Sequence, residues 1–503
     1  MRSTVLYDLE AIALKYPEKT AFADIMETFS FSKLLDYSKR IGSYLAHITR
    51  TQQPVVVYME KRAYNIAAFL GAVYAGCFYV PMDNQMPLER INLILNTLQS
   101  CVVMYDDSTK HSIESFPEEI KTVYYRDAVS CDINQRMLDQ IRLYAKSTDL
   151  LYVLFTSGST GAPKGVTLSH AAVIDFMDWI CEKYSLDCTT CLCNQAPFYF
   201  DASVPDIYIP LKTGAAVYIP PKLYYTFPKK ILQFIIDNSI NTLIWVPSAL
   251  CNVVNCRAFQ TAVPTSIRLV IFCGEVMPCK HLNTWRRYVP DALYVNMYGP
   301  TEATYACMYY DIKREFRDDE TLPLGKACEN SEIVLITDNN REAEAGEIGE
   351  ICVLGQCLSS GYYNNAEKTN AVFVENPLNT KWKEMMYRTG DLAYRENGNI
   401  IFAGRKDFQV KRLGHRIELG EIENRIMSVS GVENACCVFV AKNSDIIAIY
   451  TGEAQKDVVA KVVERKLPHY MLPTRYEHVL SMPMNLNGKI DRVRLNNEYM
   501  EEK

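Results

Sequence analysis

The chain has 503 residues, of which 49% are hydrophobic and 22% charged. This composition is ordinary for a folded globular protein and excludes a disordered chain, and the length accommodates several domains of about 100–200 residues each. Lys and Arg number 53 against 59 Asp and Glu, which gives a formal net charge of −6. A nucleic-acid-binding protein usually carries a basic balance or a basic block, so we expect no nucleic-acid partner.

The sequence shows no sign of a targeting or membrane segment. Residues 1–24 carry charges throughout, unlike a signal peptide. No apolar run reaches the roughly 18–20 residues that a membrane-spanning helix needs, so we expect a cytoplasmic protein that is not membrane-embedded. The 17 cysteines include a CxxC at Cys188 and Cys191, with Cys193 close by. Because no second ligand pair stands at zinc-site spacing, we interpret them as reduced, buried thiols.

Short apolar runs alternate with helical patterns along most of the chain. Such alternation predicts α/β layers with largely parallel sheets. The runs predict strands, and the patterns between them predict helices. The predicted strands are 54–58, 101–105, 150–155, 215–219, 242–246 and 268–272, and the predicted helices are 62–76, 229–237 and 279–288.

The pattern changes near residue 400, after strand-like stretches at 346–355 and 400–405. The remaining stretch of chain has the size of a small α+β domain with its own core. We therefore predict domains at 1–406 and 407–503. In the second domain we predict helices at 419–429 and 456–467 and strands at 435–440 and 446–450.

The segment that points most clearly to chemistry is FTSGSTGAPKGV, residues 155–166, directly after a predicted strand. Glycines let the backbone approach an anion, and successive N–H groups and hydroxyls can surround phosphate oxygens, with Lys164 adding a charge. The segment is not a Walker A loop, because Pro163 precedes the lysine and Gly165 follows it. Taken alone, it could equally be a flexible Ser/Gly surface loop.

The same segment resembles the phosphate loop of the adenylate-forming (ANL) superfamily. Further blocks resemble that family in its order along nearly the whole chain: AGCFYVPMD (75–83), NMYGPTEAT (296–304), YRTGDLA (387–393), GRKDFQV (404–410) and NGKIDR (487–492). The resemblance implies an α/β fold: a large N-terminal body of stacked α/β sheets with a small barrel-like region, and a small mobile α+β C-terminal domain. It also implies an ATP-dependent ligase that releases AMP and pyrophosphate.

The resemblance assigns an ATP site with Mg²⁺ as the metal. Glu302 is the implied Mg²⁺-linked acid and Thr301 lies beside the α-phosphate, while Asp391 accepts from the ribose hydroxyls with Arg405 as its companion. Tyr298 and the backbone of Gly274 and Glu275 flank the adenine. The full set of implied ATP-binding residues is Thr156, Ser157, Gly158, Ser159, Thr160, Gly161, Lys164, Gly274, Glu275, Asn296, Met297, Tyr298, Gly299, Asp391 and Arg405.

The family runs two half-reactions, and the resemblance assigns a residue to each change of state. Lys489 bridges the acyl carboxylate and the α-phosphate during adenylation. Asp407 is the hinge about which the C-terminal domain rotates before a thiol attacks the adenylate, a conformational step of the lid type.

Residues 194–206, NQAPFYFDASVPD, carry the substrate signal. Asp201 matches the aspartate that binds the α-ammonium group in amino-acid-activating members, and an ammonium taken from water needs such an opposite charge. Asp201 could also cap the helix that comes after it. Phe200 and Lys489 complete the implied substrate site with Asp201 and Cys273.

The amino-acid sequences of two blocks, NQAPFYFD and IFCGEVMP (271–278), resemble those of the D-alanine–D-alanyl carrier protein ligases. In that group the cysteine matched by Cys273 packs against the D-alanine methyl group. The resemblance implies transfer of D-alanine to the phosphopantetheine thiol of a separate carrier protein, as in teichoic-acid D-alanylation. Pro205, Met297 and Tyr305 depart from the group's pattern, and the two larger side chains predict a small pocket.

Three alternatives stay open. The first is a freestanding nonribosomal-peptide-synthetase adenylation enzyme for another small amino acid, which differs only in its substrate pocket. The second is an acyl-CoA synthetase, which Asp201 disfavours. The third is a non-catalytic nucleotide-binding or scaffold protein, which the presence of Lys489, Glu302 and Asp391 disfavours.

Overall fold

The structure is a computed structural model that describes residues 4–158, 162–406, 409–484 and 490–501. The expectations for Ser159, Thr160, Gly161, Asp407 and Lys489 lie outside the described residues. The chain divides into two compact units. Unit 1 comprises 1–84, 98–154 and 166–404, and unit 2 comprises 85–97, 155–165 and 405–503.

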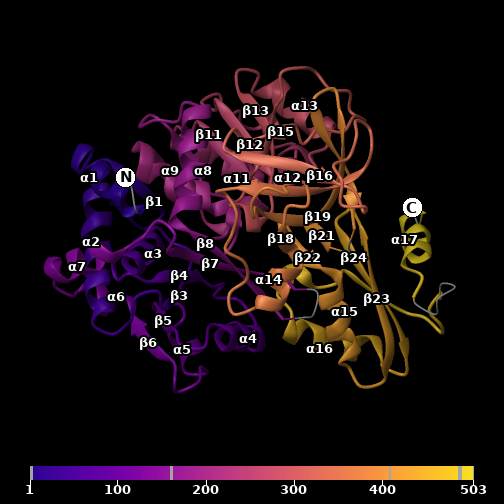
Figure 1. The fold of residues 1–503 in the computed structure, drawn as a ribbon, viewed down its shortest axis with the longest axis horizontal. Helices are drawn as coiled ribbons and strands as arrows, with labels where there is room; N and C mark the ends of the chain where they lie inside the picture. Colours follow the sequence, from indigo (N-terminus) through magenta and orange to yellow (C-terminus); the bar gives the residue numbers. More distant parts are fainter. Residues whose placement is uncertain (1–3, 159–161, 407–408, 485–489, 502–503) are drawn as a thin grey trace. The chain divides into compact units, whose positions relative to one another are not determined.

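The first sheet of the large unit has six strands in the order β6-β5-β3-β4-β7-β8 (Figure 1). Its pairs from β6 to β7 are parallel. All five residues of β3 are buried, as the continuous apolar run PVVVY requires of a strand covered on both faces. The strands are β3 (Pro54–Tyr58), β4 (Phe78–Pro81), β5 (Val102–Tyr105), β6 (Lys121–Tyr124), β7 (Leu150–Thr156) and β8 (Lys164–Ser169).

A second sheet has nine strands in the order β15-β14-β13-β12-β11-β9-β10-β1-β2. Its centre is parallel, and antiparallel pairs attach β2 at one end and β14 and β15 at the other. The strands are β1 (Thr20–Asp24), β2 (Thr28–Ser30), β9 (Cys191–Cys193), β10 (Ala216–Ile219), β11 (Thr242–Trp245), β12 (Leu269–Cys273), β13 (Leu293–Tyr298), β14 (Met308–Asp311) and β15 (Lys326–Ala327).

Helices α2 (Phe31–Ala46) and α3 (Tyr64–Tyr74) pack closely, and two glycines allow it. A Cβ on Gly71 would lie 2.4 Å from Ile41 Cγ2, and one on Gly42 would lie 2.4 Å from Tyr74 Cβ. Only a residue without a side chain fits at such a contact. The other α-helices of this unit are α1 (Leu6–Lys15), α5 (Lys110–Ile113), α6 (Tyr125–Val129), α7 (Gln135–Tyr144), α8 (His170–Lys183), α9 (Val204–Thr213), α10 (Lys222–Thr226), α11 (Pro228–Asp237), α12 (Pro247–Asn255), α13 (Cys279–Tyr288) and α14 (Ala366–Val372).

Single-turn 3-10 helices and a third sheet complete the description of unit 1. The sheet runs β16-β17-β19-β18, with β20 also on β19, and it occupies the region expected to be barrel-like. Its strands are β16 (Ser331–Ile336), β17 (Gly349–Gly355), β18 (Phe373–Glu375), β19 (Met385–Glu396) and β20 (Asn399–Arg405), and the 3-10 helices are η1 (Asp201–Ser203), η2 (Ala258–Gln260) and η3 (Thr301–Ala303).

Unit 2 has its own core. Leu419, Ile422 and Ile426 of α15 are buried in one cluster with Val459 and Val463 of α16, and both helices were predicted from the sequence. Its elements are α4 (Leu88–Leu98), β21 (Gln409–Arg412), β22 (His415–Glu418), α15 (Leu419–Met427), β23 (Val432–Val440), β24 (Asp445–Gly452), α16 (Lys456–Lys466), η4 (His469–Met471), β25 (Arg475–His478) and α17 (Arg492–Glu501).

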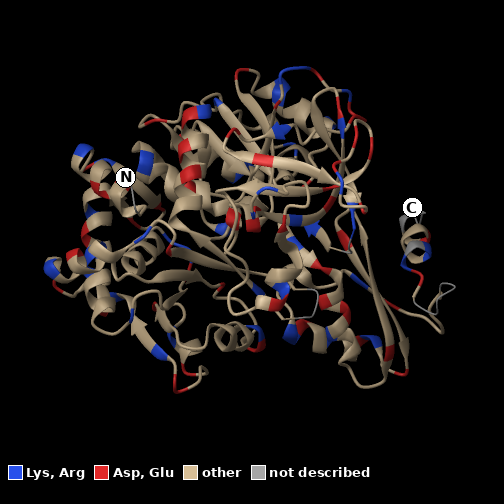
Figure 2. Ribbon diagram, in the orientation of Figure 1, with Lys and Arg blue, Asp and Glu red and all other residues tan. Residues whose placement is uncertain are grey.

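Acidic and basic residues are interspersed along the helices and strands of each unit (Figure 2). Among the described residues, no helix combines the length and the apolarity needed to cross a bilayer.

Candidate functional site

Two neighbouring strands of the nine-stranded sheet bring Cys273 and Met297 together. These residues are register partners in the parallel pair β12–β13, and both side chains are buried. The Cys273 thiol lies 3.9 Å from the main-chain oxygen of Tyr305, whose side chain is also buried. The three side chains that the sequence places at the substrate pocket therefore come from one end of two strands and the loop after β13.

That loop is held in an unusual backbone conformation. Thr304 and Tyr305 are consecutive residues with positive φ, at 50° and 74°. Such angles cost conformational energy in residues with a side chain, and they persist only where the surroundings impose them. A Cβ on Gly299 would lie 2.5 Å from the Tyr305 carbonyl oxygen, so the start of the loop needs a glycine. The Thr304 hydroxyl donates to the Cys357 carbonyl oxygen at 2.6 Å and anchors the turn.

Asp201 and Thr301, which are 100 residues apart in sequence, form a direct hydrogen bond. Asp201 begins η1 and Thr301 begins η3. The Thr301 hydroxyl donates to Asp201 Oδ2 at 2.6 Å. The carboxylate expected to bind the ammonium group and the hydroxyl expected beside the α-phosphate are therefore direct neighbours.

Glu302 is fully buried. Its Oε1 accepts from the Tyr362 hydroxyl at 2.7 Å, and its main-chain oxygen accepts from the Ser359 N–H at 2.8 Å. A buried carboxylate needs such partners, because an unpaired one carries a large desolvation cost. The sequence singles out Glu302 but gives no sign of Tyr362, which lies 60 residues further on.

Asp391 lies in β19, and its carboxylate accepts from the Tyr298 hydroxyl. Burial, followed by the adjacent Asp391 charge, raises the pKa of Tyr298 well above its usual range, so the phenol stays a donor. The Asp391 main chain is fixed as well, because its N–H donates to Thr389 Oγ1 at 3.0 Å. The structure thus joins the expected adenine neighbour to the expected ribose acceptor.

In the loop after β12, the backbone at Gly274 borders open space, whereas the side chain of Glu275 is held by a hydrogen bond. Gly274 has φ of 98°, and a Cβ there would meet nothing within 4 Å, so the backbone borders open space. Glu275 Oε2 accepts from the Ser248 N–H at 2.9 Å, at the first turn of α12. The side-chain amide of Asn296 is held by Pro323, because its Nδ2 donates to the Pro323 carbonyl oxygen at 2.8 Å.

The described part of the phosphate loop lies in unit 2 and is hydrogen-bonded there. The Ser157 hydroxyl donates to the Arg416 carbonyl oxygen at 2.7 Å and accepts from the Glu418 N–H at 3.2 Å. The Gly158 N–H donates to Glu421 Oε2 at 3.2 Å. A carboxylate thus takes the kind of position at a backbone N–H that a phosphate oxygen would take.

Three other expected nucleotide-binding residues lie at the ends of strands. The Thr156 hydroxyl at the end of β7 is buried and has no hydrogen-bond partner within the described part of the chain. Lys164 begins β8 and Arg405 ends β20, and both side chains are half-buried. Phe200, from the expected substrate site, is half-buried too, with its ring centroid 4.8 Å from that of Tyr199.

Comparison with known proteins decides the family. The model of the AMP-binding enzyme family matches residues 9–363. The chain belongs to the AMP-binding enzyme family. D-alanine–D-alanyl carrier protein ligase of Staphylococcus haemolyticus is 31% identical over 95% of both chains, and the ligase of that name from Listeria monocytogenes is 30% identical over 99% of both. The adenylation domain AlmE of Vibrio cholerae, solved with glycyl-adenosine-5'-phosphate, superposes with a TM-score of 0.83 at 20% identity, over 99% of this chain and 98% of AlmE.

These findings confirm the superfamily identified from the sequence blocks and the expected mixed α/β fold. AMP-binding enzymes of this kind are ATP-dependent, adenylate-forming ligases, so ATP is the nucleotide. The likeness to AlmE shows the fold alone.

One buried polar pair in this AMP-binding enzyme could not be recognised from the sequence. Asn194 and Asp206 stand at the two ends of the segment that carries Asp201, and both are fully buried and bonded to each other at 2.7 Å. The only available signal was their presence in NQAPFYFDASVPD, where a buried asparagine and aspartate look like ordinary loop residues.

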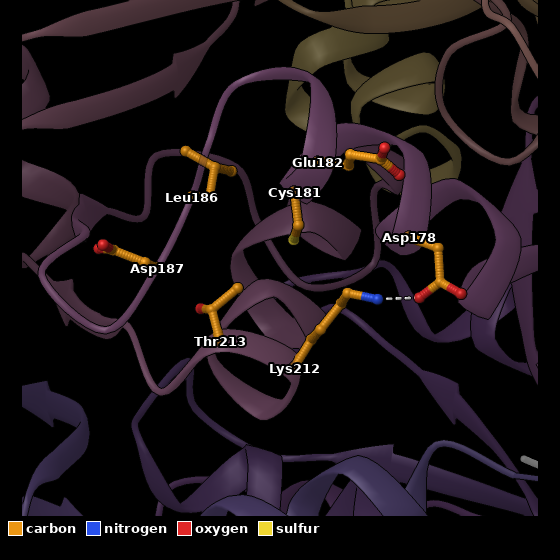
Figure 3. A pocket seen from close by; sticks show the side chains of 7 residues that line it. All are labelled: Asp178, Cys181, Glu182, Leu186, Asp187, Lys212 and Thr213. Atoms are coloured by element: carbon orange, nitrogen blue, oxygen red, sulfur yellow. Dashed lines mark hydrogen bonds and ion pairs between the residues drawn. The ribbon is translucent and has the colours of Figure 1, made fainter.

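A surface hollow of about 530 Å³ lies at the other end of α9 from Asp201 (Figure 3). Helix α9 has ten residues, so its ends are about 15 Å apart. Lys212 points across this hollow and pairs with Asp178. The hollow contains none of the residues expected in the AMP-binding site; it is lined by Asp178, Cys181, Glu182, Leu186, Asp187, Lys212 and Thr213.

Proposed function

We propose that this AMP-binding enzyme activates D-alanine with ATP as an aminoacyl-adenylate and transfers it to the phosphopantetheine thiol of a separate carrier protein. The hydrogen bond between Thr301 and Asp201 carries the proposal, because it sets an ammonium-binding carboxylate beside a phosphate-binding hydroxyl. The relatives named D-alanine–D-alanyl carrier protein ligase, similar over nearly their whole length, support the choice of amino acid and acceptor.

In this proposal Asp201 binds the α-ammonium group of the substrate, and Cys273 forms the wall against its methyl group. Met297 and Tyr305 close the remaining sides. All three wall residues are buried, so the space beside Asp201 suits a small side chain. Phe200 borders the same substrate.

The nucleotide is held by groups with matching chemistry. Asp391 accepts from the ribose hydroxyls, since a carboxylate offers two acceptor oxygens. Tyr298 and the open backbone at Gly274 flank the adenine, because no side chain stands in the way there. Phosphate oxygens are bound by Ser157, Gly158, Lys164 and Arg405. Ser157 and Gly158 do so after their hydrogen bonds within unit 2 are replaced by hydrogen bonds to the phosphates.

Magnesium fits Glu302. Mg²⁺ binds through one or two carboxylates together with phosphate oxygens and water, and does not need an all-protein cage. The described residues contain no cluster of three or more acidic, His or Cys side chains that could hold a metal alone. A single carboxylate oriented by Tyr362 agrees with that requirement. When bound, the ion neutralises charge on the triphosphate.

The proposed chemistry has two steps. A carboxylate oxygen of the amino acid attacks the α-phosphorus, a P–O bond forms, and pyrophosphate leaves. The carrier's thiolate then attacks the carbonyl carbon, a thioester forms, and AMP leaves. Positioning and charge neutralisation supply most of the rate in such transfers. Lys489 stabilises the charge between carboxylate and α-phosphate in the first step, and Asp407 is the hinge between the steps.

A second candidate substrate is glycine, with the same chemistry and carrier. Met297 and Tyr305 favour it, since both are large, buried side chains at the expected substrate pocket, where Met297 is the register partner of Cys273. A missing methyl group changes binding by only about 1–3 kcal/mol, so the two amino acids are separated by measurement.

The test is amino-acid-dependent ATP–pyrophosphate exchange with purified protein and Mg²⁺ across D-Ala, L-Ala, Gly, D-Ser, L-Ser and L-Cys. We expect the highest kcat/KM for D-alanine and loss of exchange in Asp201→Ala. The matched control is Asp187→Ala, which removes an exposed aspartate that is not among the residues expected in the AMP-binding site. A preference for another amino acid would replace D-alanine, and exchange that persists in Asp201→Ala would remove Asp201 from the site.

A further inference from the structure

The segment that carries the substrate-binding carboxylate is closed by one buried bond. It runs from Asn194, directly after β9, to Asp206 in the first turn of α9. Asn194 Nδ2 donates to Asp206 Oδ2 at 2.7 Å. Both side chains are at most 1% exposed. Between these two ends lie Phe200 and Asp201, so the bond fixes the base of the loop from which Asp201 reaches Thr301.

The remaining oxygens of this pair present a problem. Asn194 Oδ1 and Asp206 Oδ1 are buried, and neither has a hydrogen-bond partner among the residues that the structure describes. An amide oxygen is only an acceptor, and so is an ionised carboxylate. Leaving two acceptors buried and unpaired costs free energy for each. A carboxyl group that keeps its proton on Oδ1 has a donor, and Asn194 Oδ1 is the acceptor on the same amide that already binds Oδ2.

Burial favours the protonated form of Asp206. Burial raises the pKa of Asp206 to about 7, against the opposing effects of the Asn194 bond and the Lys61 charge. Burial also lowers the pKa of Lys61 to about 8, and its Nζ donates to the Gln195 carbonyl oxygen at 3.3 Å. The other titratable groups nearby are Cys193, Tyr225 and Tyr305, whose pKa values burial raises, so they are neutral.

We propose that Asp206 is a positioning residue that shares a proton with Asn194 in a two-bond acid–amide pair, and that this pair holds Asp201 in place for the substrate ammonium group. The assignment rests on the proposed function of Asp201. Loss of the proton removes one of the two bonds and leaves a buried negative charge at the base of the loop. Affinity for the amino acid therefore falls as the pH rises past 7, while affinity for ATP does not follow it.

The first variant is Asp206→Asn, which can form two hydrogen bonds with Asn194 but has no proton to lose. Its KM for the amino acid is expected to be independent of pH in the range where that of the parent protein rises. Asp206→Ala breaks the pair, and we expect its KM for the amino acid to rise about tenfold with little change in the KM for ATP. The exchange variant Asn194→Asp/Asp206→Asn restores an acid–amide pair and is expected to restore the pH dependence.

A direct readout is the carbonyl stretch of a protonated carboxyl in the infrared spectrum, present below pH 7 and lost in Asp206→Asn. Its absence at pH 6, or the same pH profile in the parent and Asp206→Asn, would overturn the assignment. The spectrum is recorded without substrate, so it tests the shared proton even if no amino acid supports exchange. In that case the proposed function fails separately from the acid–amide pair.

Discussion

Cys273 is the side chain that the proposed function places against the methyl group of the substrate. It is buried at the end of β12 with Met297 as its register partner. We expect Cys273→Ala to loosen the preference between D- and L-alanine, because it enlarges the space at the methyl group. The measurement is the ratio of kcat/KM for the two enantiomers, with an expected change of about tenfold or more, since small side-chain differences contribute about 1–3 kcal/mol.

The matched control for this change is Cys352→Ala, which removes an equally buried thiol from β17. It tests whether loss of a buried cysteine alone affects selectivity. An unchanged enantiomer ratio in Cys273→Ala would show that Cys273 is not a pocket wall.

Asp391 gives a second prediction, about the nucleotide. Asp391→Asn keeps an acceptor for Tyr298 but loses the charge that strengthens hydrogen bonds from the ribose hydroxyls. Hydrogen bonds to charged groups contribute about 1.5–3 kcal/mol, so the KM for ATP should rise at least tenfold, with the KM for the amino acid little changed. An unchanged KM for ATP would contradict the ribose assignment.

For single residues, the sequence predicts which side chains belong to the candidate site better than it predicts their hydrogen-bond partners. Asp201, Thr301 and Asp391 could be singled out because each stands in a recognisable block. The hydrogen bonds of Glu302 to Tyr362 and of Asp206 to Asn194 could not be predicted. Such contacts depend on how the tertiary fold brings separate segments together, and no local sequence pattern encodes them.

The pair of helices α4 and α15 offers a matched test of charge burial. Arg90 of α4 pairs with Glu421 of α15, and both are fully buried. Glu421→Gln leaves the Arg90 charge without its counter-ion, which typically lowers the free energy of unfolding by about 3–5 kcal/mol. We expect a clear fall in Tm, measured by calorimetry.

The control uses the same two helices. Arg425 and Glu89 form another pair between them, at 3.5 Å, with Glu89 half exposed. Arg425→Gln should change the stability by no more than about 1 kcal/mol, because exposed pairs contribute little. The double variant Arg90→Met/Glu421→Leu should regain most of the lost stability. Equal effects of the two single variants would contradict this account.

Among the elements, buried strands were the easiest to predict. The runs at 54–58 and 242–246 correspond to β3 and β11, because a short apolar stretch with β-branched residues is typical of a strand covered on both faces. Helix α9 was anticipated only as the helix that Asp201 could cap, because it contains Pro205 and Pro210, which usually argue against a helix. Pro205 is tolerated in the first turn, where its missing N–H has no helical partner.

For the molecule as a whole, a buried histidine predicts the response to acid. Burial lowers the pKa of His170 to about 3, and its Nδ1 accepts from the Val5 N–H at 3.4 Å. In the unfolded chain histidine titrates near 6.5, so acidification charges it there first. The stability that His170 contributes is therefore present above pH 6.5 and is lost as the pH falls towards 3.

We expect His170→Asn, which keeps an acceptor for Val5, to lose less Tm than the parent protein between pH 7 and 4. The control is a substitution of the exposed His111 by Asn, which should leave the fall of Tm between pH 7 and 4 unchanged. An identical fall of Tm between pH 7 and 4 in the parent protein and His170→Asn would exclude His170 as the cause of the acid sensitivity.

The overall architecture could be predicted from the sequence at the level of a large α/β part and a smaller α+β part. The assignment of residues 85–97 and 155–165 to unit 2 could not, because segments far apart in sequence join a unit through tertiary contacts alone. The predicted boundary after residue 406 lies close to the division at Gly404 and Arg405, and it stays a prediction about where the chain pivots.

The most direct measurement is identification of the nucleotide product formed before any carrier protein is added. Purified protein is incubated with ATP, Mg²⁺ and D-alanine, quenched, and the nucleotides are identified by mass spectrometry. The account predicts D-alanyl-adenylate in an amount close to that of the enzyme, and none with Asp201→Ala. Recovery of ATP without any aminoacyl-adenylate, with D-alanine and with the other small amino acids alike, would contradict it.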